Sequence, residues 1–168
     1  MIYNLNNHMN LIKHFVNGKT TSGDSVRVGK IFNPATGEQS SQVKLGSKVD
    51  LDDAVKVAKK AFETWSLKPP MQRARVMFKF KDLIEKHSDE ITKLIVSEHG
   101  KVYEDAKGSL TRGLEVVEFA CGIPQVLKGE FSENVGTDID SWSIRQPLGV
   151  CAGITPFNFP AMVPMWMF

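Results

Sequence analysis

The residues best placed for chemistry lie near the carboxyl end of the chain, around Asn158. The apolar run at residues 149–154 predicts a buried parallel strand, and TPFNFP follows at residues 155–160. In open α/β sheets, ligands bind at the carboxyl ends of strands. The amide of Asn158 offers two N–H donors that could stabilise negative charge on a carbonyl oxygen under attack. Asparagine also suits a turn, because its side chain bonds to nearby backbone; both interpretations stay open from these residues.

Arg112 is the second candidate, in a long helix predicted over residues 102–123. At about 100° per residue, it lies beside Gly113 at the margin of an apolar face. A guanidinium holds a carboxylate through two parallel hydrogen bonds. The alternative is a surface ion pair with Glu115, three residues later.

The two cysteines, Cys121 and Cys151, lie among apolar neighbours in different predicted elements. We therefore expect two buried, structural thiols in a reduced cytoplasmic protein, or in the mitochondrial matrix of a eukaryote. The four histidines are too scattered for a metal site, which we do not expect; they are His8, His14, His87 and His99.

Composition indicates a soluble globular protein rather than a nucleic-acid or membrane protein. The 168 residues are 42% hydrophobic and 24% charged, with a formal net charge of +2. The basic residues are interspersed with acidic ones, so nucleic acid is not expected as a partner. Residues 148–168 carry no charge and are long enough to span a bilayer, but three prolines and an asparagine interrupt them, and we expect no membrane segment. The N-terminus lacks the features of a signal peptide.

The first half of the chain alternates from strand signals to helix signals. Asn17-Gly18 predicts a hairpin turn, and a second turn at residues 33–37 precedes a strand at 42–45. Asp50 is expected to cap a helix. Its apolar stripe is expected to face the core; it contains Ala54, Ala58, Ala61, Phe62 and Trp65.

Three more helices are expected before the chain returns to strands. One opens at Pro69-Pro70 and runs to about His87, and the next runs from Ser88 to Gly100, burying Ile91, Leu94 and Ile95. The third is the helix at 102–123. Residues 127–140 are expected to form a loop and 141–146 a half-exposed strand, with its edge around 142–144. This order of elements predicts an α/β fold.

At this point the sequence resembles a known family. ITPFNFP at 154–160, preceded by QPLGV at 146–150, resembles the aldehyde dehydrogenase superfamily. Phe157, where most relatives carry Trp, and the tail at 161–168 are similar to its CoA-acylating branch, the methylmalonate-semialdehyde dehydrogenases. Residues 33–38 and 113–120 are similar to that branch too.

The resemblance implies roles for the candidate residues. Asn158 would be the amide that stabilises the oxyanion, and Arg112 would bind the substrate carboxylate. NAD would be contacted at the turn by Thr155, Phe157, Ile154 and Pro156. The alternative is that the apolar residues of this set close the core. The nucleophilic cysteine is expected beyond residue 168, matched by neither Cys121 nor Cys151, so the chain alone is predicted to be inactive.

The resemblance also implies an organisation and a reaction. We expect the N-terminal part of a Rossmann-like NAD-binding domain: hairpins and helices over 1–137, an oligomerisation-arm strand over 138–147, and the first part of the NAD-binding sheet over 148–168. Residues 162–168 are expected to have nothing to pack against, and hence to make the isolated chain poorly soluble. No element of a catalytic domain is expected.

The parent is expected to be a homo-oligomer, a dimer or tetramer, that oxidises malonate or methylmalonate semialdehyde to acetyl-CoA or propionyl-CoA with NAD and coenzyme A. Two alternatives remain. One is a hydrolytic NAD(P)-dependent aldehyde dehydrogenase, and the other is a non-catalytic fragment that acts only by association.

Overall fold

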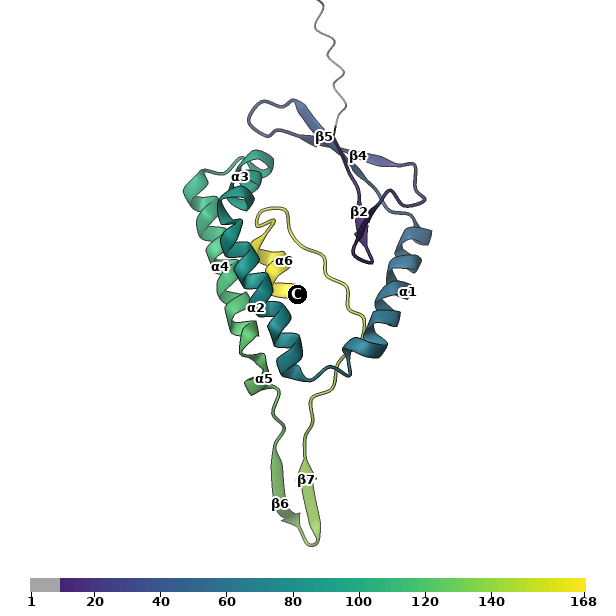
Figure 1. Cartoon of the computed structure of the whole chain (residues 1–168), viewed down its shortest axis with the longest axis vertical. Helices are drawn as coiled ribbons and strands as arrows, with labels where there is room; N and C mark the ends of the chain where they lie inside the picture. Colours follow the sequence, from purple (N-terminus) through teal and green to yellow (C-terminus); the bar gives the residue numbers. More distant parts are fainter. Residues whose placement is uncertain (1–9) are drawn as a thin grey trace, which may run out of the picture.

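The computed structural model describes residues 10–168, which begin with short strands and continue into helices (Figure 1). β5 is the centre of a three-stranded sheet, with β1 parallel to it on one side and β4 antiparallel on the other. β2 and β3 form a separate hairpin. The strands are β1 Asn10–Ile12, β2 His14–Val16, β3 Lys19–Thr21, β4 Val28–Phe32 and β5 Gln39–Lys44.

Both predicted turns are confirmed. Asn17 and Gly18 link β2 to β3 with φ angles of 54° and 70°, which is the left-handed pair that a tight hairpin requires. Between β4 and β5, the amide of Gly37 donates to the carbonyl of Asn33 at 2.8 Å. The Asn33 side chain accepts from the amide of Ala35 at 2.9 Å, which is an asparagine used for its own turn.

If Asp50 were the N-cap, helix α1 would begin at Leu51. The helix, Lys48–Trp65, begins about one turn before that residue. Ser47 is the N-cap: its hydroxyl accepts from the amide of Asp50, and the Asp50 carboxylate accepts from the amide of Ser47 at 2.8 Å. The expectation that Asp50 caps the helix is therefore wrong, because Ser47 and Asp50 form a reciprocal capping box. Asp50 also accepts from the amide of Asp24 at 2.6 Å, which ties the loop before β4 to this helix.

No residue of α1 is buried, so its apolar stripe is not part of the core. Leu51 and Trp65 are exposed to 62% and 45%. The stripe has the predicted spacing, but α1 lies to one side of the other helices (Figure 1). Helical periodicity identified a face suited to burial without showing what would cover it.

The remaining helices pack together and contain the core. Pro70 opens α2, Pro70–Lys86, and Gly100, with φ 81°, ends α3, Ser88–His99; both signals are confirmed. On α3, Thr92 is fully buried, whereas Leu94, expected inside, is 57% exposed. The long helix is α4, Tyr103–Cys121, followed by the short α5, Ile123–Val126. The core cluster is formed by Ile84, Leu110, Val117 and Met165.

The last residues of the chain form a helix that packs on α4, contrary to the expectation that residues 162–168 have nothing to pack against. In α6, Met162–Met167, both Met162 and Met165 are 6% exposed. Gly113 makes the close approach possible. A Cβ at this position would overlap the Met165 methyl group and lie 3.0 Å from the Cα of Met162. Trp166 and Phe168 remain half or more exposed.

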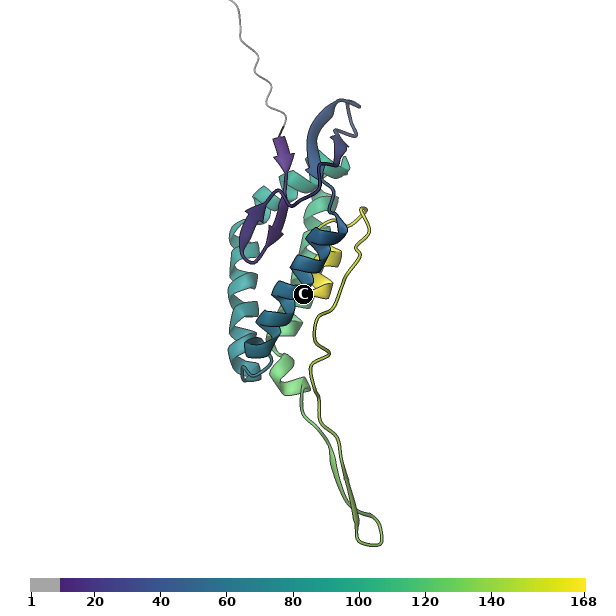
Figure 2. The ribbon, with the colours of Figure 1, turned by 90° about the vertical axis from the view of Figure 1, so that its right-hand side faces the viewer.

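Residues 127–140 are not all loop, because they contain the first strand of a projecting hairpin. β6, Phe131–Gly136, pairs with β7, Ile139–Trp142. The hairpin extends from the helices at the end opposite the N-terminal strands (Figures 1 and 2). The half-exposed strand expected over 141–146 is not formed: β7 contains only its first two residues, Ser141 and Trp142, and residues 143–146 have no regular structure. Every residue of β7 is exposed, so its alternation of polar and apolar residues produces no buried face.

The buried strand expected over residues 149–154 is not formed. Residues 148–156 have no regular structure, and Leu148 and Ile154 are each 94% exposed. A parallel strand needs neighbours for its backbone groups, and no described strand lies beside this segment. Cys151 is exposed for the same reason, so only Cys121 is the buried thiol that we expected.

The described part of the chain contains neither a membrane-spanning helix nor a cluster of metal-binding side chains. Between residues 10 and 168, no helix combines the length and apolarity needed to cross a membrane. Over the same range, no three His, Cys, Asp or Glu side chains gather where they could hold a metal ion.

Candidate functional site

The turn that carries Asn158 is held by the aromatic rings on either side of that residue. Phe157 stacks on His99, with ring centroids 6.1 Å apart and planes 22° apart. Phe159 lies under Lys101, whose Nζ is 4.6 Å from the ring centroid, which is within cation–π range. Because His99 and Lys101 flank Gly100, the turn rests against the connection between α3 and α4.

Asn158 plays neither of the two local roles that commonly explain an asparagine in a turn, which are a side-chain hydrogen bond to nearby backbone and a positive φ angle. Its side chain makes no hydrogen bond to any residue that the structure describes. Its φ angle is not positive, unlike those of Asn17 and Asn134. Asn33 shows what the local role looks like in this chain, since its side chain accepts from the amide of Ala35. The exposed amide of Asn158 is therefore free to bind a group from outside.

Arg112 lies on α4 and is exposed, with its guanidinium folded back along the helix. Nη2 donates to the hydroxyl of Ser109 at 3.2 Å. Nη1 passes over Gly108, where an added Cβ would lie 3.6 Å away. No described carboxylate lies within ion-pair distance of Arg112, and the pair with Glu115 is not formed. Since a guanidinium has five N–H donors, most of them remain free.

Lys101 and Ser109 connect these two candidates. The side chain of Lys101 is 9% exposed, and its Nζ lies 3.0 Å from Asp105 Oδ2 and 3.5 Å from Ser109 Oγ. Ser109 is 2% exposed. A continuous series of contacts thus runs from Phe159 through Lys101 and Ser109 to Arg112.

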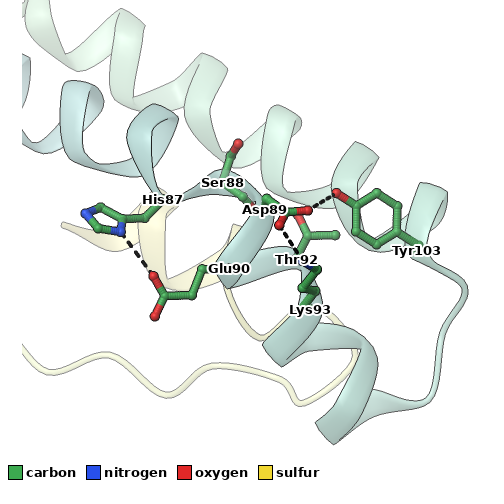
Figure 3. A network of polar contacts seen from close by, with 7 residues as sticks. All are labelled: His87, Ser88, Asp89, Glu90, Thr92, Lys93 and Tyr103. Atoms are coloured by element: carbon green, nitrogen blue, oxygen red, sulfur yellow. Dashed lines mark hydrogen bonds and ion pairs between the residues drawn. The ribbon is translucent and has the colours of Figure 1, made fainter.

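A polar network joins α3 to the start of α4, next to the connection that contains Lys101 (Figure 3). The hydroxyl of Tyr103, at the start of α4, donates to Asp89 Oδ1 on α3 at 2.7 Å, and Lys93 pairs with Asp89 Oδ2 at 2.6 Å. These hydrogen bonds from Lys93 and Tyr103 hold the pKa of Asp89 below its usual value. The two helices are therefore joined close to Lys101.

The four residues expected to contact NAD lie together but face outward. Ile154, Thr155, Pro156 and Phe157 are all exposed, with Ile154 at 94% and Phe157 at 85%. They do not close the core of the described chain, which was the alternative. They present apolar surface beside a hydroxyl, a composition that suits one wall of a binding site for an amphipathic ligand.

Neither cysteine lies in this constellation. Cys121 is 7% exposed, and burial raises the pKa of its thiol, so it is a poor nucleophile. The Cys151 thiol lies 3.8 Å from the carbonyl oxygen of Gly149, within its own segment.

Sequence reasoning missed His99, Lys101 and Ser109. Ser109 was detectable in principle, since it is a polar residue on the same helical face as Ala106 and Gly113. For His99 and Lys101 the sequence carries no comparable signal, because their role depends on residues more than fifty positions later.

Comparison with known proteins shows which family the chain resembles. The chain is 51% identical to the malonate-semialdehyde dehydrogenase of Pseudomonas aeruginosa and 48% identical to malonate-semialdehyde dehydrogenase 1 of Geobacillus kaustophilus, over 95% and 94% of its length. It spans 32% of each of those proteins, or about a third.

Solved structures give the same result. The methylmalonate-semialdehyde dehydrogenase of Oceanimonas doudoroffii superposes with a TM-score of 0.89 at 55% identity, covering 94% of this chain and 32% of that one. A Sinorhizobium meliloti protein assigned to the same activity, solved in complex with NAD, gives 0.90 at 51% identity, covering 95% and 33%. The model of the aldehyde dehydrogenase family matches residues 20–168. The chain therefore belongs to the aldehyde dehydrogenase family, as an α/β segment that corresponds to the N-terminal third of its relatives.

Proposed function

We propose that the protein carrying this chain oxidises malonate or methylmalonate semialdehyde to acetyl-CoA or propionyl-CoA. NAD is the oxidant, coenzyme A is the acyl acceptor, and the substrate carboxylate leaves as carbon dioxide. The relatives at about 50% identity bear the names of these semialdehyde dehydrogenases. The observation that carries the proposal is the free amide of Asn158, in a turn held by Phe157 and Phe159.

Asn158 would donate hydrogen bonds to the aldehyde oxygen as it becomes an oxyanion. Attack by a thiolate moves the carbonyl π electrons onto oxygen, and a fixed amide donor stabilises that charge with little reorganisation. An amide that already bonded to its own turn would have to break that bond first. The absence of such a bond among the described residues supports this role.

Arg112 would bind the carboxylate at the other end of the semialdehyde. Guanidinium and carboxylate match as a pair of parallel hydrogen bonds. Its exposed position and the lack of an acidic partner in the described chain leave it available. A fixed carboxylate would hold the aldehyde carbon at a defined distance from Asn158, which favours productive attack.

The segment 154–157 fits one wall of an NAD site. The exposed side chains of Ile154, Pro156 and Phe157 would contact the apolar faces of the cofactor, and Thr155 would offer a hydroxyl and backbone groups. When bound, NAD accepts hydride from the aldehyde-derived carbon. These residues supply packing against the cofactor; the chain's sequence has no glycine-rich dinucleotide fingerprint.

The nucleophile is proposed to be a cysteine outside residues 1–168. Cys121 is buried, and the described partner of the Cys151 thiol is the Gly149 carbonyl oxygen rather than a basic group. We accordingly propose that the isolated chain is inactive.

The proposed domain boundaries give β7 a role in assembly, and β6, which pairs with it from the preceding segment, would be carried into the same interface. Residues 138–147 would belong to an oligomerisation arm, preceded by the hairpins and helices of 1–137 and followed by the NAD-binding segment 148–168. Phe131, Ile139 and Trp142 are 65%, 58% and 66% exposed, a density of apolar surface that suits an interface within a homo-oligomer.

The test is NADH production by the purified full-length protein given malonate semialdehyde, with and without coenzyme A. We expect turnover that depends on coenzyme A and yields acetyl-CoA. Turnover indifferent to coenzyme A, with a free acid as product, would replace this proposal with a hydrolytic aldehyde dehydrogenase. No oxidation of any aldehyde would indicate a role by association alone.

A further inference from the structure

Ser109 is a buried hydroxyl whose hydrogen-bonding capacity is fully used. It donates to the carbonyl of Asp105 at 2.9 Å and accepts from Arg112 Nη2 at 3.2 Å. Its second acceptor position faces Lys101 Nζ at 3.5 Å. A serine hydroxyl offers one donor and two acceptor positions. All three are occupied, so the orientation of the Ser109 hydroxyl is determined by its partners.

Lys101 is equally constrained, and it contacts both the turn of Asn158, through Phe159, and the partner of Arg112, which is Ser109. Its Nζ contacts Asp105, Ser109 and the ring of Phe159. The carboxylate of Asp105 neutralises one positive charge, whereas Lys101 and Arg112 carry two. Asp105 pairs with Lys101, so the positive charge of Arg112, which has no ion-pair partner in the described chain, remains available to an anionic substrate.

The geometry points to Ser109 and Lys101 as positioning residues: Ser109 orients the guanidinium of Arg112, and Lys101 holds the turn that carries Asn158. This inference rests on the proposed function. It adds that the carboxylate-binding and oxyanion-binding groups are coupled through one lysine and one serine.

Arg112 and Asn158 are both exposed, so each needs another residue to hold its side chain in one arrangement. A free arginine side chain samples many rotamers, and ordering it costs conformational entropy on binding. The bond to Ser109 selects one arrangement in advance, and Gly108 leaves room for the guanidinium to lie along the helix. Similarly, the contacts of Lys101 with Phe159 and of His99 with Phe157 hold the turn against the connection between α3 and α4.

The two residues predict different kinetic changes in the full-length protein. With Ser109→Ala, we expect the KM for malonate semialdehyde to rise about tenfold, which corresponds to about 1.4 kcal/mol. The KM for propanal, an aldehyde without a carboxylate, should stay within twofold. With Lys101→Met, we expect kcat to fall about tenfold for both aldehydes, because the oxyanion donor is less well placed.

Thr92→Val is the matched control. Thr92 is also buried in a helix, and its hydroxyl donates to a carbonyl four residues earlier, that of Ser88, at 2.7 Å. It makes no hydrogen bond to Arg112 or to the turn, so both kinetic constants should stay within twofold of the original protein.

Two results would overturn the inference. One is a Ser109→Ala protein that loses the same factor on both aldehydes, or on neither. The other is a Lys101→Met protein whose kcat is unchanged. A failure of the proposed function is separate, since it would appear as an original protein with no preference for malonate semialdehyde over propanal.

Discussion

The contact between Gly113 and α6 predicts opposite outcomes for two glycine-to-alanine changes on one helix. Gly108 and Gly113 both lie within α4, so replacing either gains helix propensity of about 0.5–1 kcal/mol. At Gly108 the new methyl group meets only Arg112 Nη1, at an ordinary 3.6 Å. At Gly113 it overlaps the Met165 methyl group and lies 3.0 Å from the Met162 backbone.

The difference between the two variants isolates the cost of this overlap. The Met165 methyl group can swing aside, but the Met162 backbone moves only if α6 shifts. Overpacking of this kind costs about 1–3 kcal/mol. Because the propensity gain is common to both changes, Gly113→Ala should be less stable than Gly108→Ala by this amount.

Hydrogen–deuterium exchange measures the effect where it arises. The amides of Val163 and Met165 begin α6 by bonding to the carbonyls of Phe159 and Ala161. In Gly113→Ala we expect them to exchange about tenfold faster, since about 1.4 kcal/mol is a factor of ten in an opening equilibrium. In Gly108→Ala they should be unchanged. Equal α6 exchange in both variants would refute the close approach of α4 and α6.

Further predictions concern the capping box, the core and the isolated chain. Ser47→Ala should lower the free energy of unfolding by about 1 kcal/mol in urea denaturation, because α1 loses its N-cap. Backbone amides lower the pKa of Asp50 from 3.8 to about 2, so its stabilisation is complete above about pH 4 and is lost as the pH falls towards 2. Asp50→Asn should therefore flatten the fall of Tm between those values. Leu110→Ala, at a core position 3% exposed, should cost about 2–5 kcal/mol by the same urea assay. The isolated chain should associate in light scattering, because Leu148, Ile154 and Phe168 leave apolar surface exposed, and it should produce no NADH. A monomeric chain with a cooperative melt would contradict the first expectation.

Local signals in the sequence predicted the parts of the fold that local physics decides. Asn17-Gly18 requires left-handed backbone at two positions, Pro70 suits only a first helical turn, and Gly100 provides a left-handed helix end. Each of these turns or ends depends on residues a few positions apart. Such signals can be read without knowing the tertiary structure.

The errors arose where long-range contacts decide. Residues 149–154 have the composition of a buried strand, but a strand forms only with neighbours, and the described chain provides none there. Residues 162–168 form a helix because Gly113, about fifty positions earlier, leaves a space for Met165. The same limit applies to the site: Asn158 and Arg112 are chemically conspicuous, whereas Lys101 acquires its role only through Phe159.

The most direct test of the central claim is the kcat of Asn158→Ala in the full-length protein with malonate semialdehyde, NAD and coenzyme A. Loss of one oxyanion donor predicts a fall in kcat of about 10²–10³ with KM nearly unchanged. Asn33→Ala, which removes an asparagine used for its own turn, is the matched control and should leave kcat intact. An Asn158→Ala protein that retains its kcat within twofold would contradict the account.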